Sequence, residues 1–330
     1  MEFKTSPRDE YLHEPPNKRL WNESYFFDFN ADEIRGFMRL GFFPYERRAN
    51  AWFYAVYQGE VYWYRDENIP IEDCFGLHLD TDDLELHYDL VRPYEEWNIR
   101  AEGAGMATTE TETVLLGSGD RADFQADLTF TDPYHDAVDM DMLVDTQYHY
   151  EHSGRIVGEI SLGDDRIEID GVGYRDHSWG WFRDWTPGEW GHLACFAQFP
   201  SGDCFTLIAS TTPDDEVYHT YGYHANDEMM RPIENASVEW NDGHDREDRA
   251  RAWARGEYPD DAEFAIEFED SVETLQCAPL ANVPIGFEDR NWALSDPDGP
   301  RLKSIINRMP ADCTWNGHDG HAWPEELLPI

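Results

Sequence analysis

The sequence predicts an all-β protein made of two closed antiparallel sheets. Short runs rich in aromatic and β-branched residues recur along most of the chain, with turn signals between them, at the spacing of an antiparallel barrel or sandwich. The length of 330 residues exceeds one comfortable core and fits two domains. Apolar residues make up 41% of the chain and aromatic residues 15%, which supplies packed cores and argues against disorder.

Three stretches predict particular elements. Gln58-Gly59 separates two strongly β-prone runs, residues 50–57 and 60–67, and this pattern predicts a hairpin. Residues 249–255 alternate Arg with Ala and Trp, which suits a strand with one solvated face better than a helix. Residues 300–309 are the best candidate for a helix, and that helix would be short.

The domain organisation is read from composition and breaks. Residues 1–20 are polar and carry prolines, so they predict an N-terminal arm. The clearest later break is Thr186-Pro187-Gly188. We therefore expect a first barrel over residues 21–185 and a second over residues 186–330.

Charge is the extreme feature of the composition. There are 69 acidic and 25 basic residues, a net charge of −44 and a pI near 4.3, and only three lysines, at positions 4, 18 and 303. Acid enrichment spread over the whole chain predicts the solvated surface of a halophilic protein; the alternative is an acidic patch for cationic partners or calcium. Such a chain repels nucleic acid and anionic membranes, so nucleic-acid binding is excluded.

The cysteines and the N-terminus predict the compartment. Five cysteines form no C-x-x-C pair and no even set, which favours buried free thiols in a reducing cytoplasm. The N-terminal residues lack a basic and then apolar leader, and no run approaches the roughly 18 apolar residues of a membrane helix. We expect a cytoplasmic protein with no transmembrane segment; the oligomeric state stays open.

The stretch Arg166–Trp185 holds more chemical variety than any other. It begins as a strand in which Ile167 and Ile169 alternate with acidic residues. Gly171 and Gly173 then allow a bulge, a sharp bend or the close approach of a ligand or a second backbone. If the alternation survives the glycines, the residues that follow divide between two faces, with Arg175, His177 and Trp179 on the face of the isoleucines and Tyr174, Asp176 and Ser178 on the other. A bulge would exchange the two sets.

Three motifs resemble a known group. The run G-x-G-Y-x-D-H-S-W-G (Gly171–Gly180) resembles the D-H-x-W-G element of the AttH-like and carotenoid 1,2-hydratase (hydroxyneurosporene synthase) group. A haloarchaeal branch is more similar still, through W-x-E-S-Y-F-F (Trp21–Phe27) and H-Y-E-H-S-G-R (His149–Arg155). Members of this group are tandem lipocalin-like proteins, so the resemblance implies two lipocalin-like antiparallel β-barrels packed together.

The D-H-S-W-G run carries the candidate chemistry. A buried imidazole such as His177 can have a pKa near neutrality and deliver a proton to an alkene or carbonyl, while Asp176 or Arg175 sets its charge. The indole of Trp179, with Tyr174, would shape the substrate and stabilise a developing cation. The resemblance carries His177 and Trp179 over as pocket residues. The alternative is that they only pack the seam between two barrels.

Aromatic residues of the first barrel are candidates for a ligand lining. A barrel of about eight strands has room for one apolar ligand. The candidates are Trp52, Tyr54, Trp63 and Trp97. Their alternative role is ordinary barrel core.

Other enzyme classes are excluded by geometry. Ser178 cannot form a triad with His177 and Asp176, because adjacent strand residues point in opposite directions. Gly171-x-Gly173 is no nucleotide fingerprint, since no helix follows it.

No cofactor and no metal site are predicted. The pairs His149/His152 and His318/His321 have the spacing of ligands on a helix, whereas both lie in predicted strands or turns.

These patterns lead to one functional hypothesis and two alternatives. The leading hypothesis is that the protein binds a small hydrophobic molecule, isoprenoid or lipid-like, with cofactor-free proton transfer on it (hydration, cyclisation or isomerisation). The first alternative is a non-catalytic lipid carrier or stress-related protein. The weaker one is a carbohydrate-binding β-sandwich, because exposed Trp and acidic side chains also suit sugars.

Overall fold

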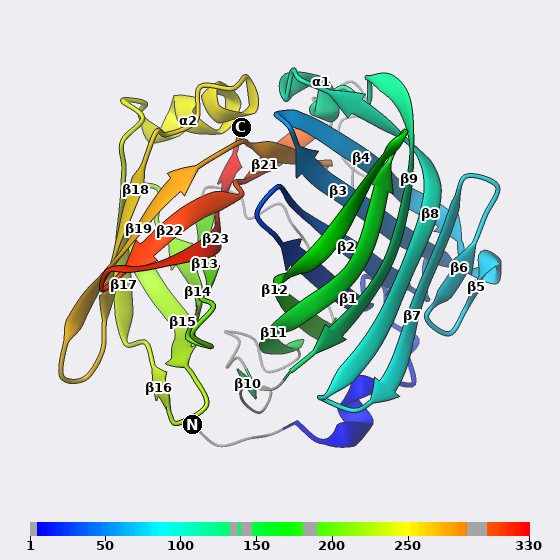
Figure 1. The fold of residues 1–330 in the computed structure, drawn as a ribbon, viewed down its shortest axis with the longest axis horizontal. Coiled ribbons are helices and arrows are strands. Elements are labelled where there is room, and N and C mark those ends of the chain that lie inside the picture. The colour runs from blue at the N-terminus through cyan, green and yellow to red at the C-terminus, as the bar shows by residue number, and fades with distance from the viewer. Residues whose placement is uncertain (1–4, 133–137, 140–146, 181–189, 289–301) are drawn as a thin grey trace. The chain divides into compact units, whose positions relative to one another are not determined.

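The structure, a computed structural model, describes residues 5–132, 138–139, 147–180, 190–288 and 302–330 (Figure 1). The chain divides into two compact units: unit 1 comprises Met1–Thr108 and Gly119–Arg183, and unit 2 comprises Thr109–Ser118 and Asp184–Ile330. The boundary expected at Trp185 lies outside the described residues. Each unit is built around one large, curled antiparallel sheet, as the lipocalin-like prediction requires.

Unit 1 is a closed barrel preceded by a short 3-10 turn, η1 (Pro7–Glu10). Its strands are β1 (Asn22–Asn30), β2 (Ile34–Phe43), β3 (Arg48–Tyr57), β4 (Glu60–Pro70), β5 (Cys74–Phe75), β6 (His78–Asp80), β7 (Leu84–Arg92), β8 (Glu96–Thr108), β9 (Asp120–Thr131), β10 (Val138–Asp139), β11 (Gln147–Leu162) and β12 (Asp165–Gly180), with a second turn, η2 (Ile71–Asp73), after β4. Because β9 pairs with both β8 and β11, the ring β11-β12-β1-β2-β3-β4-β8-β9 closes on itself. Strands β7, β6 and β5 continue from β8 (Figure 1).

The hairpin predicted at Gln58-Gly59 joins β3 to β4. Tyr57 pairs with Glu60, and the two turn residues have φ of +51° and +82°. A two-residue turn with both φ values positive matches the twist of the flanking strands. Inside the barrel, Phe53 of β3 stacks on Phe124 of β9 at a centroid distance of 4.0 Å. The barrel is therefore filled with packed aromatic side chains over much of its length.

Unit 2 is a second curled sheet with two short helices, α1 (Glu112–Leu115) and α2 (Arg246–Ala254). Its strands are β13 (Gly191–Gln198), β14 (Cys204–Thr211), β15 (Val217–Ala225), β16 (Met230–Pro232), β17 (Asn235–Trp240), β18 (Ala262–Glu267), β19 (Val272–Pro279), β20 (Val283–Glu288), β21 (Leu302–Arg308), β22 (Ala311–Trp315) and β23 (His318–Pro329). The order runs β16-β15-β14-β13-β23-β22-β19-β18-β17; β21 also pairs with β23, and β20 pairs with β21. The four cysteines with described side chains are free and buried in this unit.

Two predictions of local structure were wrong. Residues 249–255 fall mostly in helix α2, because Ala and Arg favour helix and the buried Trp253 packs against Met309. Residues 302–308 form strand β21, which pairs with β20 on one side and β23 on the other. A strand buried on both faces shows no alternation, so its sequence cannot be told from a short helix. Within the described parts of the chain, no helix is both long and apolar enough to span a membrane.

Strand β12 keeps its alternation through both glycines. Its pairing with β11 is continuous over its whole length, and its pairing with β1 has the same offset at Val172, between the glycines, as it has from Arg175 onward. A Cβ at Gly171 would lie 2.0 Å from the carbonyl oxygen of Asn30, and one at Gly173 would lie 2.7 Å from that of Asp28. The glycines therefore serve the close approach of β1, not a bulge, and the residues after them keep the facing that alternation predicts.

The close approach at Gly171 makes a stability prediction. The change Gly171→Ala should lower the free energy of unfolding by about 1–3 kcal/mol, because the added methyl overlaps the β1 backbone. Urea denaturation measures the loss. Asp170→Ala, at the exposed neighbouring position, should change stability by less than about 0.5 kcal/mol. Equal stability of Gly171→Ala and the wild type would contradict the assigned register.

Candidate functional site

The three sequence motifs meet on neighbouring strands. Residues 21–27 fall on β1, residues 149–155 on β11 and the D-H-S-W-G run on β12, and the sheet order is β11-β12-β1. His177 is paired with Tyr150 of β11 on one side and with Tyr25 of β1 on the other. The motifs thus build one continuous patch on the inner face of the barrel.

A buried carboxylate from the arm lies at the centre of this patch. Glu10, at the end of η1, is inaccessible to solvent, and Arg175 is 1% exposed. Nη2 of Arg175 donates to both oxygens of Glu10, at 2.9 and 3.0 Å. Further donors are the indole Nε1 of Trp97 and the backbone N–H of Tyr94, each at 3.1 Å, and the hydroxyl of Tyr150. Glu10 is therefore held by a guanidinium, an indole, an amide and a phenol.

The charges of this pair are fixed by their surroundings. Burial alone would raise the pKa of Glu10, but the charge of Arg175 and the hydrogen bond from Tyr150 lower it to about 2. Arg175 also donates to Nδ1 of His152 at 3.0 Å, and Nε2 of that ring contacts Asp132. Glu10 is accordingly ionised and Arg175 charged over the whole physiological range.

His177 lies next to this ion pair and is fully buried. Its Nε2 is 2.9 Å from Oε1 of Glu23, and its Nδ1 is 3.2 Å from the hydroxyl of Tyr150. The ring stacks on Tyr25 at a centroid distance of 3.9 Å. Burial lowers the pKa of His177, and the hydrogen bond to Glu23 offsets part of that effect.

The arm supplies a second imidazole at the edge of the patch. Nδ1 of His13 is 2.8 Å from Oε1 of Glu23, and its Nε2 is 3.3 Å from Asp9. Burial lowers the pKa of His13, but the two carboxylates outweigh it and raise that pKa overall. The side chain is 22% exposed and stacks on Trp179, which in turn stacks on the half-exposed Tyr148. Of the two imidazoles that contact Glu23, His13 is therefore the one nearer to solvent.

These groups form one hydrogen-bonded network, which has fewer protons than contacts when both imidazoles are neutral. It contains five contacts: Glu10–Tyr150, Tyr150–His177, His177–Glu23, Glu23–His13 and His13–Asp9. With ionised carboxylates and neutral imidazoles, the phenol and the two rings supply three protons for the five contacts. The network is fully paired only when both rings are also protonated; the raised pKa of His13 favours that form of its ring, and the lowered pKa of His177 opposes it.

The residues predicted for the site divide between the two faces. Arg175, His177, Trp179 and Trp97 lie on the inner face and belong to this patch. The strand alternation puts the others on the outer face, namely Tyr174, Asp176, Trp52, Tyr54 and Trp63. The side chain of Asp176 therefore lies on the opposite face of the strand from that of His177; its carboxylate is 3.8 Å from His149.

The outer-face aromatic residues have partners of their own. Trp52 lies between two guanidinium groups, 4.7 Å from Arg39 and 5.3 Å from Arg65, and its Nε1 donates to Glu67 at 2.7 Å. Tyr54 stacks on Phe37 at 4.9 Å. The ring of Trp52 is thus engaged in cation–π contacts with two arginines, which argues against an apolar lining there.

Five members of this network were missed from the sequence: Asp9, Glu10, His13, Glu23 and Tyr150. Glu23 and Tyr150 lie inside the motifs Trp21–Phe27 and His149–Arg155, so those motifs carried the signal. Asp9, Glu10 and His13 lie in a polar, proline-bearing arm that has no strand period to place them.

The donor atoms of His13, Glu23 and His177 lie within 4.8 Å of one another, a spacing that could hold a metal ion. Ligand atoms around zinc are about 3.3 Å apart, because each lies about 2.0–2.1 Å from the metal in a tetrahedron. Here the two imidazoles approach Oε1 of Glu23 to 2.8 and 2.9 Å. The arrangement is therefore that of direct hydrogen bonds.

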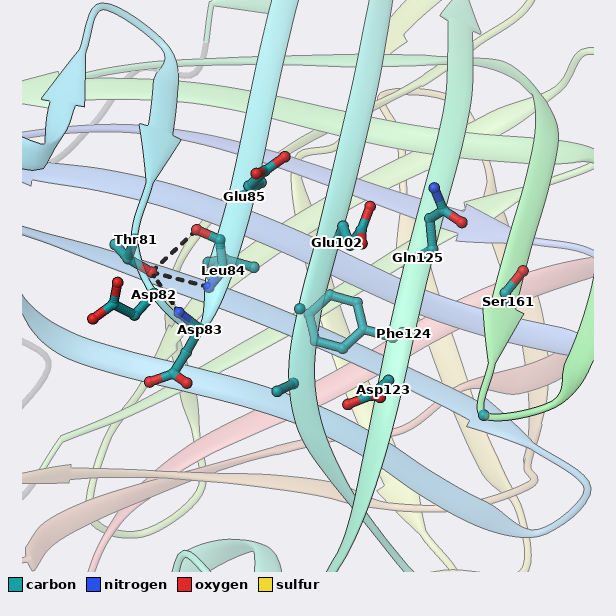
Figure 2. Close-up of a pocket in the computed structure, with 13 residues that line it drawn as sticks. Thr81, Asp82, Asp83, Leu84, Glu85, Glu102, Asp123, Phe124, Gln125 and Ser161 are labelled. Atoms are coloured by element: carbon teal, nitrogen blue, oxygen red, sulfur yellow. Dashed lines mark hydrogen bonds between the residues drawn. The ribbon is translucent and has the colours of Figure 1, made fainter.

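A cavity of about 430 Å³ opens at the other end of the same strands. Phe124 in its wall is near the start of β9, whereas Phe130, near the end of β9, lies against Arg175. Figure 2 shows its apolar residues Leu84 and Phe124 surrounded by the acidic residues Asp82, Asp83, Glu85, Glu102 and Asp123. The cavity is separate from the patch around His177.

Comparison with known proteins gives the family and the fold. The profile of a family described as a domain of unknown function (DUF7064) matches residues 6–326. No curated protein matches the sequence.

Three solved structures are similar in fold. An AttH-type protein of Nitrosomonas europaea has a TM-score of 0.63 and 12% identity, over 99% of this chain and 96% of its own. Kievitone hydratase from Nectria haematococca has a TM-score of 0.58 and 9% identity, over 96% and 90%. CghA has a TM-score of 0.53 and 9% identity, over 94% and 88%. At these identities the likeness establishes a shared fold, which the resemblance had implied.

The buried pair predicts a pH-dependent loss of stability. At neutral pH, Glu10→Gln should lower the free energy of unfolding by about 3–5 kcal/mol, because it leaves Arg175 buried without its counter-charge. The lowered pKa of Glu10 means that its ionisation stabilises the fold above pH 4.5, its ordinary pKa, and that this stabilisation disappears as the pH falls towards about 2.

Urea denaturation of both proteins at several pH values checks this. The stability difference between wild type and Glu10→Gln should shrink below pH 4.5, over the range in which both still fold. Glu14→Gln, at an exposed position of the same arm, is the control and should show no such difference. A difference that stays constant with pH would refute the ion pair.

Proposed function

Since the chain belongs to the DUF7064 family, we propose its function from the site itself: it binds a small, predominantly apolar molecule in unit 1 and transfers a proton to or from that molecule without a cofactor. The observation that carries the proposal is the hydrogen-bonded network that has Asp9 at one end and Glu10 at the other, with fewer protons than contacts when its imidazoles are neutral. A structural network would be expected to pair its donors and acceptors completely, whereas this one needs bound protons to do so. Hydration, cyclisation and isomerisation all begin with such a transfer.

The solvent-exposed end of the hydrogen-bonded network, at His13, suits the reaction. A flat unsaturated molecule would stack on Tyr148 and Trp179, beside His13. The Nε2–H of His13 has the longest contact in the network, 3.3 Å to the partly exposed Asp9, and is the proton to be given to an alkene or carbonyl. The π-face of Trp179 stabilises the cation that develops.

The buried part of the hydrogen-bonded network returns a proton to His13. Glu23 bridges His13 and His177 through one oxygen. When His177 carries a second proton, it gives the one on Nε2 to Glu23 as Glu23 protonates Nδ1 of His13 and Nε2 of His13 protonates the substrate. His177 is left neutral, and a proton from solvent reloads the network through His13 before the next turnover. His177 is then a relay residue behind the group that meets the substrate. Addition of water to the cation, followed by loss of a proton from the added water, completes hydration, and loss of a different proton from carbon completes isomerisation. The fold shared with kievitone hydratase supports hydration as the first reaction to test.

The second candidate is a non-catalytic carrier. Tyr25 and Tyr150 cover the ring of His177, and the cavity of about 430 Å³ lies at the other end of the barrel. In a carrier, the buried network would only fasten the arm to the barrel.

Native mass spectrometry of the protein purified from its own host identifies the ligand. We expect one co-purified apolar molecule per chain. Incubating that molecule with the protein in D₂O should add deuterium to carbon, or deuterium together with water. A bound molecule that gains neither label would establish the carrier instead.

The relay makes a prediction about His177. His177→Gln should slow label incorporation about 100-fold or more while leaving ligand binding within a few-fold, because it removes proton resupply and not the stacking surface. His87→Gln, a partly exposed histidine of β7 paired with Asp80, is the matched control and should keep full activity. Unchanged turnover in His177→Gln would remove the relay from the mechanism.

The large excess of acidic residues supports the proposal that the protein works in a cytoplasm with a high salt concentration. A net charge of −44 produces self-repulsion, which salt screens. The urea midpoint of the wild type should therefore rise as KCl increases from about 0.1 M to about 2 M, where the screening length falls from about 10 Å to below 3 Å. A midpoint that falls over this range would contradict halophilic adaptation.

A further inference from the structure

We infer that the groups around Glu10 form a binding site for an apolar carboxylic acid, and that the arm fills this site when the acid is absent. The inference goes beyond the proposed function: an acid bound here displaces the arm, and with it His13, so it describes a second binding state of unit 1 that is separate from proton transfer.

The barrel itself contributes donors to this site. Arg175 comes from β12, Tyr150 from β11 and Trp97 from β8, and the backbone N–H of Tyr94 comes from the β7–β8 turn. All four point at one position, and the carboxylate there comes from a segment outside the barrel ring. Convergent donors around a buried guanidinium are the arrangement that recognises a carboxylate.

The arm resembles a bound acid. Glu10 places its carboxylate among the donors, and Leu12, two residues later, packs against the barrel core. The residues around them are largely outside: Pro7 and Arg8 are exposed, and Tyr11 is 49% exposed. An acid with an apolar body could take the places of the Glu10 carboxylate and the Leu12 side chain together.

The buried charge determines what can replace the arm. If Glu10 left alone, Arg175 would stay buried without a counter-ion, which is strongly unfavourable. The arm can therefore leave readily only in exchange for another anion. A neutral lipid or an alcohol of the same length would not make that exchange. Since the whole chain carries −44, its long-range field repels anions, and the affinity has to come from Arg175 and apolar contact.

Chemical rescue of the full-length Glu10→Ala variant tests the site. Removing the carboxylate should lower the melting temperature, and acetate, propionate and butyrate should restore it in a saturable way. Each added CH₂ should tighten binding about fourfold, the factor that corresponds to burying one methylene. Sodium chloride at the same ionic strength should not reproduce the effect.

Three controls make the rescue specific. The wild type, whose site is filled by Glu10, and Glu14→Ala should show no carboxylate-specific rise. The double variant Glu10→Ala/Arg175→Met should lose the rescue, because the guanidinium is gone. A folded Glu10→Ala protein that responds equally to chloride and to carboxylates would overturn the inference.

A second measurement uses the wild type and does not depend on the variant folding. Trypsin cleavage of the arm after Arg8, Lys18 and Arg19 reports whether the arm has left the barrel. Octanoate should accelerate this cleavage several-fold, and octanol should not. Equal acceleration by both, or by neither, would also overturn the inference.

These experiments separate this inference from the proposed catalysis. Rescue and arm release without isotope incorporation would keep the carboxylate site and reject the reaction. Incorporation into a substrate without a carboxylate, together with no rescue, would keep the reaction and reject the site.

Discussion

The ion pair between Arg175 and Glu10 is the contact on which the interior of unit 1 depends. A guanidinium inside an aromatic barrel is tolerated only with a counter-charge and satisfied hydrogen bonds, and Glu10 supplies the charge. Because that carboxylate belongs to the arm, the pair also fixes where the arm runs. The position of the arm then places His13 against Glu23 and Trp179. The acid–base groups are thus assembled by a single buried contact.

The arrangement joins two environments that are usually separate. His177 is sealed in the barrel, where burial favours its neutral form, whereas His13 is partly exposed and favours its protonated form. Both rings contact the same oxygen of Glu23. In the proposed mechanism, a proton passes between the buried imidazole and the partly exposed one through this carboxylate.

Much of the barrel could be predicted from the sequence, for identifiable reasons. Alternation at Ile167 and Ile169 carried through to His177 because the glycines between them admit β1 instead of forming bulges. The hairpin at Gln58-Gly59 followed from turn chemistry. Elements buried on every side could not be predicted, since they have no alternation, as residues 302–308 show.

The candidate site was predictable only where it lies on strands. Alternation across the glycines puts Arg175 and His177 on one face and Asp176 on the other, as the structure has them, although the sequence also allowed a bulge that would exchange the two sets. The aromatic content gave Trp97 as a lining residue, but it gave Trp52, Tyr54 and Trp63 as well, and these lie on the outer face. Local rules could not place Glu10, because its environment is made by residues about 85 to 165 positions later. No periodic pattern in the arm records that contact.

That sequence separation has a consequence for synthesis of the protein. Strand β1 pairs with β12, and Glu10 with Arg175, across 165 residues. At ribosomal rates of about 5–20 residues per second, the first strand waits roughly ten to thirty seconds for its partner to emerge. During that time the aromatic edge of β1 is unpaired, and high contact order slows its closure further. Nascent chains of this protein should therefore depend on chaperones, or on the repulsion of their acidic side chains, to stay apart until the twelfth strand arrives.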